Sequence, residues 1–305
     1  MIFRRLTPWS HRTPPMLRPI HEHLAQPLMR SLRRTMMLLL LILGAFSSSI
    51  FAQDKMTLWE TPSFFRGFCI SDWDNLHDDF VALDDFTSLK AAGANFVVLQ
   101  TGVICSVTQP YGPHVWDVDG TDTTYWRDVL DQMVAYARQV ALYYVISVRS
   151  GPGRVDVAED EGNSTIWKNT EEQQLYGSML RAMAERYLPD PLFVGLDVTV
   201  EPNPLGNLAG EAVGVLAAAL QGQGIDMNAI NELWIDSIRE ADVELPILVQ
   251  GVHWSNPAYF SLVAVQSDDA VVYKTHCYNP DDYSHAASAF SVGYPGAYFS
   301  NAAQT

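Results

Sequence analysis

A glutamate ends one of the most apolar stretches of the sequence, where a carboxyl group could transfer protons. Residues 191–203 read Pro-Leu-Phe-Val-Gly-Leu-Asp-Val-Thr-Val-Glu-Pro-Asn. A short apolar run bounded by turn residues predicts a buried strand of a parallel sheet, and Pro202 has no N–H with which to extend it. Glu201 would lie at the carboxyl end of that strand. A carboxyl group half-buried beside apolar walls keeps its proton to higher pH than free Glu, as a general acid must. The alternative is an acid that caps the next helix or pairs with Arg.

Three other predicted strands end in polar or aromatic residues. One ends at Arg149 before a Gly-Pro-Gly turn, one is followed by Trp254, and one runs into His276 and Tyr278. Side chains alternate along a strand, so His276 and Tyr278 are expected on the same side. Trp254 could stack on the apolar face of a sugar, although Trp, His and Tyr are also common core residues.

The elements that must position these residues alternate between strand and helix. Strands are expected at 66–71, 94–100, 141–148, 191–200, 246–252 and 270–276. Helices are expected at 79–92, 124–139, from 170 onward, at 228–241 and at 257–265, with a loop or weak helix at 205–224. The helix from 170 is expected to bury an apolar face of Leu175, Met179, Met183 and Tyr187. This order implies right-handed crossovers and a parallel sheet. We predict an α/β fold, a (β/α)8 TIM barrel of which this chain holds about six of the eight βα units.

The chain divides into an N-terminal leader and one domain of the size of a (β/α) barrel. Residues 30–34 are basic, 36–46 are almost wholly apolar, and 47–52 are mostly small. This pattern predicts an N-terminal extension and a signal peptide over 1–52, and not a membrane span, because the apolar part is too short to cross a bilayer. Met29 is an alternative start. Residues 53–305 match one barrel domain in size. We expect a secreted protein, extracellular or periplasmic, with no membrane association after cleavage.

Charge and cysteine content narrow the classes of partner. Seven Arg and one Glu lie in residues 1–52, so the remainder of a chain with 19 basic and 35 acidic residues has a net charge of −22. Such a surface repels nucleic acid and anionic lipid. The sequence has three cysteines, Cys69, Cys105 and Cys277. Cys69 and Cys277 are expected to be small core residues, although one disulfide among the three is possible in an exported protein. No Cys or His pair has the spacing of metal ligands, so we expect no metal, and we expect no cofactor. We also expect a monomer.

Taken together, the strand ends resemble glycoside hydrolase family 5, the cellulase-type retaining barrel enzymes, over roughly residues 64–300. Residues 66–68 resemble its first strand, residues 143–153 its third strand and the following turn, and residues 194–204 the fourth-strand segment with an Asn-Glu-Pro motif. The segment 276–278 resembles the His-x-Tyr of its sixth strand. The resemblance implies a glycan substrate.

The same resemblance assigns roles to single residues. It implies that Glu201 is the acid/base and that His276 and Tyr278 line the −1 subsite, and we expect Trp254 and Arg149 to contact the glycan as well. Three positions depart from the family pattern: Val200 replaces the Asn before the acid/base, Val98 an Arg of the second strand, and Arg149 a His of the third. Losing the Asn removes a hydrogen bond to the sugar, worth about 1–3 kcal/mol in the transition state.

The second carboxyl group of a retaining pair has no counterpart in this sequence. The family's nucleophile is a Glu on the seventh strand, and no Glu follows Glu244. Asp268, Asp269, Asp281 and Asp282 are expected to be solvated turn acids. The sequence therefore predicts a chain that stops before the nucleophile strand.

Three hypotheses follow. The first is a glycosidase acting on a β-linked glycan, inactive as this chain alone. The second is a non-catalytic carbohydrate-binding protein, favoured by the three departures. The third is another family of the same barrel clan, with specificity altered around Arg149 and Arg154.

Overall fold

The computed structural model describes residues 54–71, 73–74, 79–101, 129–154, 164–206, 208 and 212–277, and the side chains of these except at 73–80. The predicted signal peptide, Cys105, Tyr278 and the acids at 281 and 282 lie outside these ranges. The expectations placed on them remain predictions.

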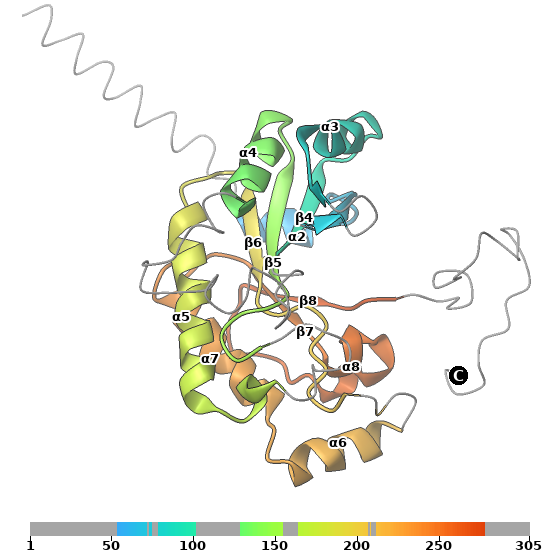
Figure 1. The fold of residues 1–305 in the computed structure, drawn as a ribbon, viewed down its shortest axis with the longest axis vertical. Coiled ribbons are helices and arrows are strands. Elements are labelled where there is room, and N and C mark those ends of the chain that lie inside the picture. The colour runs from blue at the N-terminus through green and yellow to red at the C-terminus, as the bar shows by residue number, and fades with distance from the viewer. Residues whose placement is uncertain are drawn as a thin grey trace, which may run out of the picture. The chain divides into compact units, whose positions relative to one another are not determined.

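A six-stranded parallel sheet forms the centre of residues 54–277 (Figure 1). Its order is β1 (Gly67–Ser71), β4 (Phe96–Thr101), β5 (Tyr143–Val148), β6 (Phe193–Asp197), β7 (Ile247–Gln250) and β8 (Val271–Lys274). Every strand pairs with the next one along the chain, with one register shift between Tyr144 and Val145 in the β5–β6 pair. The predicted α/β fold with strands in barrel order is confirmed.

Helices join successive strands and cover one face of the sheet. They are α3 (Leu83–Ala91), α4 (Asp131–Gln139), α5 (Thr170–Tyr187), α6 (Val213–Gly222) and α7 (Met227–Arg239), followed by the short turns α8 (Val252–Ser255) and η5 (Pro257–Leu262). Figure 1 shows α5 alongside α7, on the same side of the sheet as α4.

Side-chain caps explain where the two long helices begin. Asn169 accepts hydrogen bonds from the N–H groups of Glu171 and Glu172 at 3.0 and 3.4 Å. Asp226 does the same for Asn228 and Ala229 at 3.0 and 3.1 Å. These bonds satisfy amides that have no partner inside a helix, so the polar residue before each apolar periodic run fixes the first turn.

The strands bury both faces, each in its own apolar cluster. Toward the helices, residues such as Leu99, Ile146 and Val249 join side chains from α4, α5 and α7 in the larger cluster. Alternate residues, including Val145, Leu248 and Val272, form a second cluster on the other face, which we call the inner face. Burial on both faces explains why the strands are almost continuously apolar.

A short helix closes the amino-terminal end of the inner face. In α2 (Lys55–Glu60), Leu58 is buried in the inner cluster. The indole N–H of Trp59 donates to the carbonyl of Val194 in β6 at 2.8 Å. The rings of Phe65 and Phe96 pack beside it, at centroid distances of 4.6 and 5.8 Å from Trp59. The first described element is thereby joined to the fourth strand of the sheet.

Several expectations about local structure are wrong in detail. The helix predicted from residue 79 begins at Leu83, because Asp79–Phe80 pairs as β3 with Trp73–Asp74 (β2) in a two-stranded antiparallel ribbon. On α5, Leu175 is 44% exposed, and Tyr176 and Leu180 are buried in its place. The weak-helix region 205–224 contains a regular helix, α6.

The cysteines also differ from expectation. Cys69 and Cys277 are free thiols on exposed residues and not core residues. Cys69 lies on β1 and Cys277 lies three residues beyond the end of β8, and β1 and β8 are the two edge strands of the sheet. Across the same ranges, no helix combines the length and apolarity needed to cross a membrane.

Candidate functional site

Glu201 lies at the carboxyl end of the sheet, four residues beyond the last residue of β6. The chain continues along β5 after the strand ends, since the N–H of Val200 donates to the carbonyl of Val148 at 2.9 Å. At Glu201 the backbone turns into the left-handed region, with φ 49°. Its N–H donates to the side-chain oxygen of Gln250, at the end of β7, at 3.0 Å. The strand-end position predicted for this acid is the one observed.

The carboxylate of Glu201 is held between two basic side chains. One oxygen, Oε2, accepts from Nη2 of Arg149 at 3.1 Å, and Oε1 lies 2.7 Å from Nδ1 of His276. Glu201 is 9% exposed. The expectation of apolar walls is therefore wrong: the carboxyl group is buried among charged and polar groups. A guanidinium at this distance favours the ionised carboxylate, whereas apolar walls would favour the acid.

A buried arginine supports the backbone beneath the carboxylate. Arg154 is 2% exposed, and its guanidinium donates to the hydroxyl of Thr199 and the carbonyl of Val200. The hydroxyl of Tyr176 donates to the carbonyl of Val198 at 3.0 Å, and burial raises the pKa of Tyr176 to about 12, so the phenol stays neutral. Arg154 thus fixes the chain leading to Glu201, and it is not placed on a surface that could select a substrate.

Four polar residues meet on the inner face just below Glu201. The fully buried Asp197 accepts at Oδ2 from Ser147, Gln250 and Lys274, at 2.6, 2.7 and 2.7 Å. They come from four adjacent strands, β5 to β8. Sequence reasoning missed this cluster. Its signal was a polar residue at the last strand position of three successive apolar strands, which end at Asp197, Gln250 and Lys274.

Trp254 lies beyond β7 in a turn of unusual backbone geometry. His253, Trp254 and Ser255 are consecutive residues with φ of 57°, 56° and 59°. The turn is fixed because the hydroxyl of Ser255 donates to the carbonyl of Lys274 at 2.9 Å and the N–H of His276 donates to the carbonyl of Ser255 at 2.9 Å. Non-glycine residues rarely adopt this conformation, and such strain gathers at functional sites. The same turn positions Trp254 and the residue that contacts Glu201.

The imidazole of His253 is packed between aromatic rings. Its ring centroid lies 4.6 Å from Trp254 and 4.7 Å from Tyr259. Burial lowers the pKa of His253, so a neutral ring is favoured. His253 is therefore a packing residue behind Trp254 and does not contact the carboxylate.

The three departures from the family pattern occupy different environments. Val200 is fully buried and Val98 lies half-buried on the inner face, so neither presents a polar group. Arg149 is the departure that touches Glu201. Within the ranges that the structure covers, no cluster of three or more His, Cys, Asp or Glu side chains could hold a metal ion.

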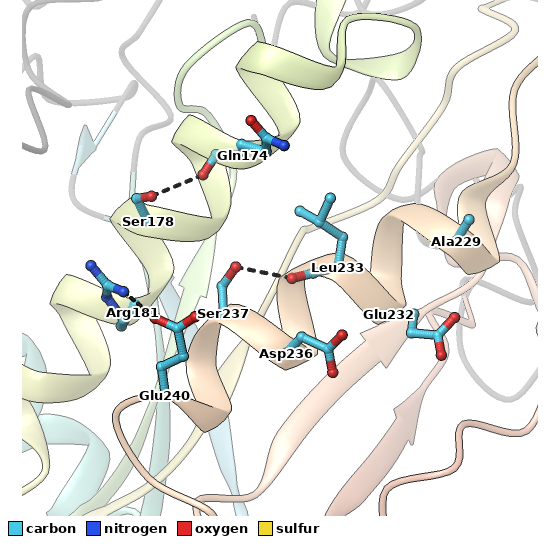
Figure 2. A pocket seen from close by; sticks show the side chains of 9 residues that line it. All are labelled: Gln174, Ser178, Arg181, Ala229, Glu232, Leu233, Asp236, Ser237 and Glu240. Carbon is cyan, nitrogen blue, oxygen red and sulfur yellow. Dashed lines mark hydrogen bonds and ion pairs between the residues drawn. The ribbon is translucent and has the colours of Figure 1, made fainter.

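A separate groove lies between α5 and α7, on the helical side of the sheet (Figure 2). Figure 2 shows Ser178 and Ser237 donating to carbonyl groups of their own helices, and Arg181 paired with Glu240. None of the strand-end residues lines this groove. The residues to which the sequence analysis assigns chemistry therefore lie apart from this groove.

Comparison with known proteins gives a family match and several relatives. Residues 60–304 match the family described as cellulase (glycosyl hydrolase family 5). Endoglucanase C of Acetivibrio thermocellus is 22% identical over 233 residues, which cover 72% of this chain and 60% of that protein. A probable glucan 1,3-beta-glucosidase A of Aspergillus fumigatus is 28% identical over 133 residues, or 43% and 30% of the two chains.

The fold comparison gives the same architecture. The crystal structure of Thermotoga maritima Cel5A in complex with mannotriose superposes with a TM-score of 0.51 at 17% identity, over 80% of this chain and 68% of the other. The chain spans about 60% of the length of the endoglucanase that it matches.

Proposed function

Because the chain belongs to glycosyl hydrolase family 5, we propose that it is a secreted glycosidase with Glu201 as its acid/base. Its substrate would be a β-linked polysaccharide or oligosaccharide, cleaved with retention of configuration. The observation that carries the proposal is the placement of Glu201, at the carboxyl end of a parallel sheet with basic groups on both carboxylate oxygens. That end of the sheet is where barrel enzymes bind and react. Secretion is supported by the basic, apolar and small-residue order of residues 30–52.

In the first step, Glu201 would give its proton to the glycosidic oxygen as the bond from that oxygen to the anomeric carbon breaks. A second carboxylate would form the new bond to the anomeric carbon. In the second step, ionised Glu201 would take a proton from water, whose oxygen displaces that carboxylate. Arg149 and His276 would hold the carboxylate in place during both steps. We assign the nucleophile to no residue between 1 and 305.

The side chain of Trp254 would form part of the glycan surface. Trp254 is presented by a fixed turn and is only partly buried. Sugar rings have apolar faces that stack on an indole. We expect Trp254→Ala to weaken oligosaccharide affinity about tenfold, the equivalent of about 1.4 kcal/mol, and Trp254→Phe to retain most of it. Isothermal titration with cello-oligosaccharides measures this, and equal affinity in the alanine variant would remove Trp254 from the site.

One observation favours a second candidate, a non-catalytic carbohydrate-binding protein. The guanidinium of Arg149 lies 3.1 Å from the carboxylate of Glu201, where a cation stabilises the ionised form, whereas the first step needs the protonated acid. Val200 replaces the family's Asn as well. In that case the strand ends would bind glycan without cleaving it.

Leaving-group dependence separates the two candidates. An acid/base is essential for poor leaving groups and dispensable for dinitrophenyl glycosides, which need no protonation to depart. In a protein that supplies the second carboxylate, we expect Glu201→Gln to abolish cleavage of oligosaccharides, to retain the first step on dinitrophenyl β-glycosides, and to be accelerated by azide. Oligosaccharide binding without release of reducing sugar, identical in the wild type and in Glu201→Gln, would establish the binding protein.

A further inference from the structure

Gln250 joins the backbone of Glu201 to the interior of the sheet. It is 1% exposed at the last position of β7. Its side-chain oxygen accepts from the N–H of Glu201 at 3.0 Å, and its side-chain nitrogen donates to Oδ2 of Asp197 at 2.7 Å. In the opposite amide orientation, the side-chain nitrogen of Gln250 would face the N–H of Glu201 and its oxygen would face the carboxylate of Asp197. These two partners therefore determine the orientation of the amide. Each polar end of the side chain therefore has a specific task.

The backbone that Gln250 holds is strained. A non-glycine residue at φ 49° costs about 1–2 kcal/mol relative to the right-handed region. Pro202 follows, and a proline further restricts the residue before it. This conformation directs the carboxylate of Glu201 to Arg149 and His276. Without an acceptor for its N–H, the buried peptide of Glu201 would lose the bond that stabilises this conformation.

Asp197 in turn prevents the amide of Gln250 from rotating. The carboxylate of Asp197 is held by Ser147 at 2.6 Å and Lys274 at 2.7 Å. The path therefore runs from β8 through β6 and β7 to the residue that we assign as acid/base. The amide of Gln250, the one side-chain amide in this path, is buried away from water.

We propose that Gln250 is a positioning residue for Glu201, acting through the main-chain N–H of Glu201 and touching neither substrate nor the carboxylate of Glu201. This inference rests on the proposed function only for the role of Glu201. Replacing Gln250 should leave the acid chemically intact but release it from Arg149 and His276.

The titration of the Glu201 carboxyl group measures this release whether or not the chain hydrolyses glycan. The δ-carbon resonance of Glu201, assigned by its absence in Glu201→Gln, reports the midpoint by ¹³C NMR. Arg149→Met sets the reference, because losing the adjacent cation should raise the midpoint. We expect Gln250→Met to raise it by about 0.5 pH unit or more. The matched control Asn231→Leu, at an amide on α7 that is also 1% exposed, should leave it unchanged.

Each outcome decides the role of Gln250. A folded Gln250→Met with an unchanged midpoint overturns the proposal. If that variant does not fold, Gln250→Asn decides, since it keeps an amide that is one methylene too short to reach both partners. Failure of both to fold, with Asn231→Leu folded, would make Gln250 a residue of the fold alone and also overturns the proposal.

Activity provides an independent readout. If the wild type hydrolyses aryl glycosides, Gln250→Met should lower kcat roughly 10- to 100-fold, with KM unchanged within about twofold, because only the placement of the acid is altered. A wild type that neither cleaves nor binds glycan would refute the proposed function, while the titration would still decide the positioning role.

Discussion

Lys274→Met should be among the most destabilising changes of a charged residue in the described chain. The ammonium group of Lys274 lies 2.7 Å from the carboxylate of Asp197. Methionine has nearly the same length and volume but no charge, so the substitution removes the cation and leaves the packing. The carboxylate of Asp197 would then remain fully buried with only the neutral donors of Ser147 and Gln250.

The expected loss of unfolding free energy follows from how deeply each partner of the ion pair is buried. Breaking a buried ion pair by removing one partner costs about 3–5 kcal/mol. The side chain of Lys274 is 21% exposed, so water screens part of the interaction, and we expect about 2–3 kcal/mol. For a domain of this size that corresponds to a fall in Tm of about 5–10 °C.

Denaturant and thermal unfolding measured by circular dichroism check this value. The control is Arg181→Met, which loses an exposed pair with Glu240 and should cost no more than about 1 kcal/mol. The double variant Asp197→Asn with Lys274→Met should be more stable than Lys274→Met alone, because a neutral amide needs no cation. Equal unfolding free energies for Lys274→Met and Arg181→Met would refute the reasoning.

Two further predictions concern other contacts. Arg239 binds both carboxylate oxygens of Asp268, at 2.6 and 2.8 Å, and holds the pKa of Asp268 below its ordinary value of 3.8. The stabilisation is present above that value and is lost as pH falls through the lower folded pKa. Asp268→Asn should therefore cost about 1 kcal/mol at pH 7 and flatten the acid side of a Tm–pH curve, whereas an unchanged curve would contradict the assignment. In the middle of α5, a Cβ at Gly177 would lie 2.6 Å from the hydroxyl of Ser237. Gly177→Ala should destabilise by about 1–3 kcal/mol in urea unfolding, while Gly214→Ala, with nothing within 4 Å, should stabilise by up to about 1 kcal/mol; the same sign for both would show that helix packing does not decide the effect.

Apolar periodicity was sufficient to predict the order of the elements. Each buried strand is a short apolar run, and each long helix begins at a polar cap, so the six strands and their parallel pairing follow from local sequence. The exceptions arise from tertiary contacts. Leu175 has helical spacing but faces outward, because Tyr176 and Leu180 occupy the core side of α5. Asp79 and Phe80 leave the helix pattern because they pair with residues 73–74.

The position of Glu201 was predictable, but its surroundings were not. An acid after an apolar strand implies a strand end. Contact with Arg149 and His276 depends on a positive φ that Gln250 stabilises from a strand 49 residues later. Likewise, the left-handed turn at 253–255 has no glycine to indicate it. Long-range hydrogen bonds of this kind leave no local pattern.

The contact between α2 and β6 determines when the domain can fold during synthesis. Trp59 donates to a carbonyl that lies 135 residues further along the chain. The inner cluster that it closes also needs Leu248 and Val272. A ribosome that delivers the chain from its amino end would thus release most of the domain before this cluster could form. We expect the inner cluster to form only after Val272 has been synthesised, so that α2 stays undocked while the strands between it and β8 are being made.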